Sequence, residues 1–81
     1  MKVKVHYENE ELDKLVKDEE TRELIVQTLI LYPVTWEIIR DMMCQGLSGY
    51  QIKAMCGMWY IKGQPISIAW RKTKTVLGVI R

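Results

Sequence analysis

The sequence predicts a small domain that is mainly α-helical with a minor β component, a helix-turn-helix domain with an amino-terminal strand. Three observations predict this α+β class. Residues 35–57 read as two capped helices, residues 2–7 alternate strictly between polar and apolar, and the apolar residues of 66–80 fall on one helical face. Because the chain has 81 residues and no evident linker or internal repeat, we expect a single domain over 1–81.

The first half of the chain is expected to add two helices to this domain. Asn9 can cap a short helix over 10–17, and the acidic cluster 18–20 suits the start of a second helix. Pro33 should end that second helix at about residue 31 or 32, because a proline disfavours the α conformation of the residue before it.

The central helix pair has the clearest local signals. Thr35 is placed to cap the first helix, and Gly46 is a natural left-handed stop. Ser48 and Gln51 have the spacing of a capping box at the start of the second helix. We expect Gly57 to close that helix.

Two interpretations of the last third of the chain stay open. In the first, Pro65 starts an amphipathic helix over 64–80, which the apolar periodicity favours. In the second, residues 58–70 form the β-hairpin wing of a winged helix and residues 75–80 add a strand, which β propensity favours. Residues 58–61 are expected to be extended in both, where they can pair with the amino-terminal strand.

Residues 35–57, about a third of the chain, resemble helix-turn-helix DNA-binding domains, because two short helices joined by a glycine-containing turn are the signature of that motif. The resemblance implies that the helix after Ser48 is presented to duplex DNA. With a wing at 58–70, the resemblance would extend to winged-helix domains.

The charge distribution is strongly asymmetric and supports a polyanionic partner. Residues 1–41 carry six basic and ten acidic side chains, whereas residues 42–81 carry six basic side chains and no carboxylate side chain. Such asymmetry suggests that the second half meets a polyanion or an acidic partner protein.

The predicted DNA-binding residues lie on the second helix of the pair and in the basic tail. Tyr50 could contact a base or the backbone, and Gln51 could read adenine, although the capping box would occupy the same side chain. Ser48 and the free amides beside it could hold a phosphate. The cations expected to neutralise phosphates are Lys53, Lys62, Arg71, Lys72 and Lys74.

Catalytic and metal-binding motifs are missing from the sequence. It has no glycine-rich phosphate loop, HExxH, CxxC or nucleophile elbow, and its single histidine cannot complete a metal set with Cys44 and Cys56. We therefore expect no enzyme activity, no metal and no cofactor. The sequence has no apolar run of membrane-spanning length and no secretion signal, so we expect a cytoplasmic protein with reduced thiols.

Two functions from different classes remain. The first is a phage- or plasmid-type transcriptional regulator that binds duplex DNA as a homodimer, because a lone strand needs a partner and two half-sites raise affinity. The second is a small inhibitor or adaptor that docks on a nucleic-acid-binding protein, with the acidic residues of 10–23 imitating phosphates.

Overall fold

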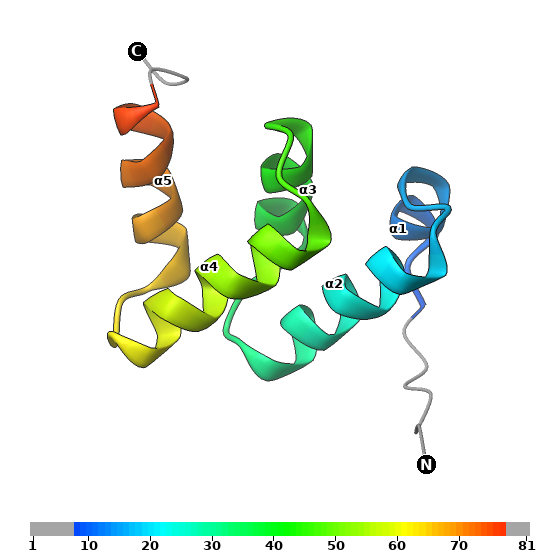
Figure 1. Cartoon of the computed structure of the whole chain (residues 1–81), viewed down its shortest axis with the longest axis horizontal. Helices are drawn as coiled ribbons and strands as arrows, with labels where there is room; N and C mark the ends of the chain where they lie inside the picture. Colours follow the sequence, from blue (N-terminus) through cyan, green and yellow to red (C-terminus); the bar gives the residue numbers. More distant parts are fainter. Residues whose placement is uncertain (1–7, 78–81) are drawn as a thin grey trace.

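Five α-helices make up residues 8–77, the part of the chain that the computed structural model describes (Figure 1). No strand occurs in these residues, so the predicted α+β class and the winged-helix alternative are wrong for them. The strand predicted at 2–7, and with it the argument for dimerisation, lies outside the described residues. In chain order the helices are α1 (Glu10–Leu15), α2 (Glu19–Leu31), α3 (Trp36–Cys44), α4 (Gly49–Ile61) and α5 (Ile66–Val76).

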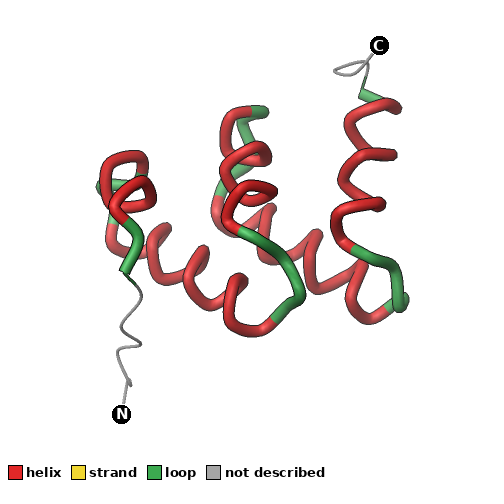
Figure 2. The backbone as a smooth tube through the Cα atoms, turned by 180° about the vertical axis from the view of Figure 1, so that it is seen from behind, coloured by secondary structure: helices red, strands yellow, loops and turns green. Residues whose placement is uncertain are grey.

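The helices are arranged as two sets. α2 and α4 lie side by side, and α1, α3 and α5 rise from one side of this pair (Figure 1). The view from behind shows the same order, with α3 between α1 and α5 (Figure 2). The core lies where these helices meet, and its fully buried side chains are Leu12, Ile25, Thr28, Ile39, Met42, Ile52, Cys56 and Ile66.

Local capping signals set the starts of three helices as predicted. Asn9 Oδ1 accepts a hydrogen bond from Leu12 N at 3.0 Å, and Asp18 caps α2 by accepting from Thr21 N at 2.8 Å. Ser48 starts α4 with a complete capping box. These bonds satisfy amide groups that have no partner within their own helix.

Helix ends follow the predictions less uniformly. α2 stops at Leu31, two residues before Pro33, and Gly46 ends the α3 segment with a φ of 92°. Thr35 occupies the N-cap position of α3, but its side chain makes no capping hydrogen bond.

α4 does not end at Gly57, and residues 58–61 are helical rather than extended. Ile52, Cys56 and Trp59 recur at the spacing of one helical face and are all buried, so continuing the helix brings Trp59 into the core. Gly57 is itself buried and lies against Tyr32. A Cβ atom at this position would lie 2.9 Å from Tyr32 Oη, which is too close. Here glycine provides room for a neighbouring side chain and does not end the helix.

The helical interpretation of the last third is confirmed over Ile66–Val76, although Pro65 is the N-cap and not the first helical residue. Ile66, Ala69 and Trp70 are buried at helical spacing. A strand would have placed residues 66, 68 and 70 on one face, but Ile68 is 50% exposed. Residues 78–80 of the predicted helix lie outside the described part.

The fold repeats one helical hairpin. α2 and α4 both have 13 residues, and each is followed by a connection of the same length, at 32–35 and 62–65, and then by a helix of the other set. We found no repeat in the sequence because residues at equivalent positions differ in chemistry, as Glu20 and Tyr50 do. The repetition is therefore one of helix length and packing.

Candidate binding surface on α4

The eight residues predicted to bind DNA do not form one surface. Four of them lie at the start of α4, Lys62 caps its far end, and the last three lie on α5. Several of these side chains already have partners within the fold, and those partners decide which of them are presented to the outside.

The side chains of Ser48 and Gln51 are occupied by the capping box. Ser48 Oγ accepts from Gln51 N at 3.2 Å, and Gln51 Oε1 accepts from Ser48 N at 2.8 Å. The competition foreseen for Gln51 is thus present in the structure, and its amide oxygen is directed to the backbone of its own helix.

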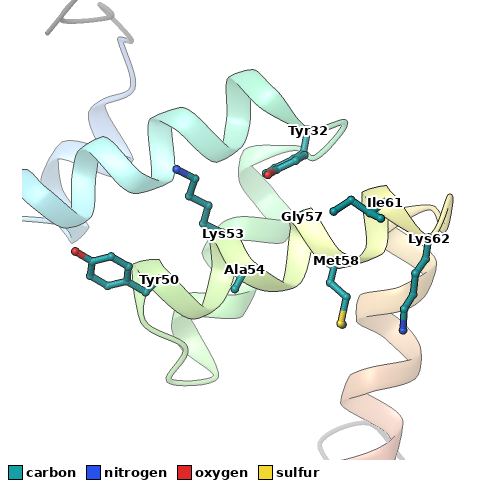
Figure 3. A pocket seen from close by; sticks show the side chains of 8 residues that line it. All are labelled: Tyr32, Tyr50, Lys53, Ala54, Gly57, Met58, Ile61 and Lys62. Atoms are coloured by element: carbon teal, nitrogen blue, oxygen red, sulfur yellow. The ribbon is translucent and has the colours of Figure 1, made fainter. Parts of the chain in front are cut away.

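Tyr50 and Lys53 lean across onto α2. The Tyr50 hydroxyl donates a hydrogen bond to Glu20, and this carboxylate raises the pKa of the phenol. Lys53 Nζ donates to Gln27 Oε1 at 2.7 Å, and Figure 3 shows its side chain extended toward α2. Tyr50 is nevertheless 62% exposed, so one side of its ring still faces solvent. The beginning of α4 therefore lies beside the acidic first turn of α2, which disfavours the approach of a phosphate.

Lys74 joins α5 to α3. Its Nζ lies 2.6 Å from Asp41 Oδ2, which also accepts a hydrogen bond from Trp70 Nε1 at 2.8 Å. The Lys74 ammonium group also lies over the Trp70 ring. The hydrogen bond from Lys74, followed by that from Trp70, lowers the pKa of Asp41. Within residues 8–77, Lys62, Arg71 and Lys72 are exposed and make no ion pair. They are therefore the cations that residues 42–77 present to solvent.

An apolar groove that our sequence analysis missed runs along α4. Its volume is about 630 Å³, Gly57 lies at its base, and Ile61, which is 85% exposed, lies near its end (Figure 3). No carboxylate side chain lines it. Among residues 8–77 it is lined by Tyr32, Tyr50, Lys53, Ala54, Gly57, Met58, Ile61 and Lys62.

One sequence signal could have revealed this groove. Tyr50, Ala54, Met58 and Ile61 follow one another at spacings of four, four and three, which places them on one face of a continuous helix. We expected the helix to end at Gly57 and the next residues to be extended, so this pattern was divided between two elements.

Comparisons of the chain with protein-family models, with curated proteins and with solved structures give no match. Within residues 8–77, no helix is both long and apolar enough to cross a membrane. The same part of the chain contains no group of three or more His, Cys, Asp or Glu residues placed to hold a metal ion. We therefore argue a function from the α4 groove and from the exposed cations of α4 and α5.

Proposed function

We propose that this chain is a protein-binding module whose α4 groove takes an apolar segment of a partner protein flanked by carboxylates. The observation that carries the proposal is the outward face of α4, where Tyr50, Met58 and Ile61 are exposed around Ala54. A run of large apolar side chains left in contact with water marks an interaction site, because covering it removes apolar area from solvent.

The charges at the edge of the groove favour an acidic partner. Lys53 and Lys62 line it, no carboxylate side chain does, and the chain has no Asp or Glu after Asp41. A carboxylate beside the apolar ridge at the far end of α4 would therefore meet Lys62, away from Glu20 at the Tyr50 end of the groove. Such complementarity raises the association rate and selects against basic partners.

The same face argues against α4 as a helix that reads bases. Base edges are recognised by polar side chains that hydrogen-bond in the major groove. Here the outward positions hold Ala54, Met58 and Ile61, while Gln51 and Lys53 are bonded within the protein.

The proposal is tested with designed peptides and two matched variants. The probe is a fluorescent peptide of about 16 residues, long enough for four to five helical turns. As a helix it would carry leucine and alanine on one face and glutamate on both flanks. A second peptide with lysine in place of glutamate is the charge control. Binding is measured by fluorescence anisotropy at physiological salt.

We expect the glutamate peptide to bind. The Ile61→Glu substitution should lower its affinity about tenfold or more, because burial of an isoleucine side chain contributes about 1.5–3 kcal/mol. Val76→Glu is the matched control, since Val76 on α5 is 86% exposed but lies outside the groove. Equal binding of the two peptides, or equal loss in the two variants, would contradict the proposal.

Duplex-DNA binding is a second candidate, favoured by one observation: Lys62, Arg71 and Lys72 are exposed and unpaired among the described residues. Phosphate contacts from these cations would give an affinity that falls steeply with salt. Arg71→Ala with Lys72→Ala should weaken binding to a labelled duplex and flatten that salt dependence. Absence of duplex binding even at low salt would remove this candidate.

A further inference from the structure

The α4 groove resembles a surface that already binds a helix inside this molecule. α4 lies along α2 in the same direction, since Tyr50 bonds Glu20 near the starts of the two helices and Lys53 bonds Gln27 further along. Gly57 then packs under Tyr32, the residue that caps the end of α2. α2 thus offers α4 one face along its whole length.

The equivalent face of α4 is the groove. α2 and α4 have the same length of 13 residues, so their positions can be compared directly. The second, sixth and ninth residues and the C-cap of α2 all contact α4, and the same four positions of α4 all line the groove. The pairs are Glu20 and Tyr50, Leu24 and Ala54, Gln27 and Gly57, and Tyr32 and Lys62.

We infer that the groove takes an α-helix of a partner protein, lying parallel to α4 as α4 lies parallel to α2. This inference rests on the proposed function and specifies its ligand. The bound helix takes the place that the first helix of a third hairpin would occupy. A helix suits a groove on a helical surface because its ridge of side chains fits between rows of side chains on α4.

Close contacts between α2 and α4 indicate what the bound helix carries. A Cβ atom on Gly49 would come 3.3 Å from Thr21 Cγ2 and 3.4 Å from Leu24 Cδ1, so α4 approaches α2 through a glycine in its first turn. By the same geometry, a small residue in the first turn of the bound helix faces Ala54. A carboxylate further along the bound helix faces Lys62, at the far end of the groove.

Neither α1 nor α2 of a second copy of this chain supplies such a helix. The carboxylates of α2 all lie in its first half, and its last residues include Ile30 and Leu31, which are exposed and apolar. Parallel docking of α2 would therefore place apolar side chains beside Lys62. α1 has only six residues, which is too short to follow the groove along α4.

The direction of the bound helix is measured with paramagnetic labels. The glutamate peptide described above carries a nitroxide at its amino end or at its carboxyl end, and amide signals of the isotope-labelled full chain are recorded with each. We expect the amino-terminal label to broaden the amide of Tyr50 and the carboxyl-terminal label to broaden that of Ile61. Circular dichroism should show that the peptide gains helix on binding.

The possible outcomes separate this inference from the proposed function. Failure of the peptide to bind overturns both, whereas binding with reversed labels, or without gain of helix, overturns only the parallel helix. Ala54→Glu adds a like charge in the groove at an exposed helical position, and it should weaken binding about tenfold while the far-ultraviolet spectrum is unchanged. If sedimentation shows a dimer of the chain that the peptide dissociates, a second copy fills the groove and the inference of a separate partner is wrong.

Discussion

Replacing Asp41 by alanine should destabilise the fold, because one carboxylate joins α3 to two residues of α5. Asp41 Oδ2 accepts hydrogen bonds from Trp70 Nε1 at 2.8 Å and from Lys74 Nζ at 2.6 Å. Trp70 is only 3% exposed, so its indole N–H would be left in a poorly solvated place without an acceptor. An unpaired buried donor costs about 1–3 kcal/mol.

The lysine half of this contact contributes less. The side chains of Lys74 and Asp41 are 19% and 36% exposed, and pairs with that much access to water contribute about 0.2–1 kcal/mol. Asp41→Ala should therefore lower the free energy of unfolding by about 2–3 kcal/mol. Asp41→Asn keeps an acceptor for Trp70 and should cost about 1 kcal/mol.

Urea denaturation followed by far-ultraviolet circular dichroism measures both values, and it does not depend on the fluorescence of Trp70. Lys74→Met serves as the control, because it removes the cation and leaves Asp41 with Trp70. A loss below about 0.5 kcal/mol in Asp41→Ala, or an equal loss in alanine and asparagine variants, would refute the reasoning.

The same contact predicts a dependence on pH. The hydrogen bond from Lys74, then that from Trp70, holds the pKa of Asp41 below its usual range. The contribution of the charged carboxylate is therefore complete above the unfolded pKa of about 3.9 and is lost as the pH falls through the lower folded pKa. The stability difference between the wild-type chain and Asp41→Asn should shrink as the pH falls below about 4. A difference that stays constant from pH 7 to pH 3 would contradict this assignment.

Three further predictions test other parts of the fold. Ser48→Ala removes the capping box with Gln51 and should lower the free energy of unfolding by about 1 kcal/mol in urea denaturation, whereas Ser48→Asp should retain most of it. Gly46→Ala should cost about 1 kcal/mol in the same assay, since its φ is 92°, and Gly46→Asn should cost less. Burial raises the pKa of the Cys56 thiol to about 11, so a thiol reagent at pH 8 should label exposed Cys44 quickly and Cys56 only after urea is added.

Helix boundaries were predictable where one residue and its near neighbours decide them. Asn9, Asp18 and Ser48 each bond a backbone amide three residues away, so their roles are visible in the sequence. Gly57 was misread because its role depends on Tyr32, which lies far away in the sequence and packs against it only in the folded chain. A glycine can end a helix or admit a neighbour, and its sequence context favoured the first.

The candidate binding surface was less predictable than the helices for the same reason. Tyr50 and Lys53 have polar character that suits DNA, but their partners Glu20 and Gln27 come from a helix whose position beside α4 depends on tertiary packing. Conversely, Ile61 reads as a core or strand residue, yet it is among the most exposed apolar side chains of the described part. Exposure is set by the neighbouring helices, so a list of residue types could not locate the groove.

The charge asymmetry of the chain also follows from the fold. Carboxylates of earlier helices serve donors of later ones: Glu11 accepts from Trp36 Nε1 and Arg40, and Asp41 accepts from α5. No helix is described after α5, so no later helix among residues 8–77 packs on the exposed face of α5 or on the end of α4. The cations there, Lys62, Arg71 and Lys72, form no ion pair among these residues. No Asp or Glu follows Asp41 in the sequence, so we expect carboxylates for these cations to come from a partner. The unpaired cations and the open apolar groove thus have the same cause: among the described residues, no further helix packs against the second hairpin, α4–α5.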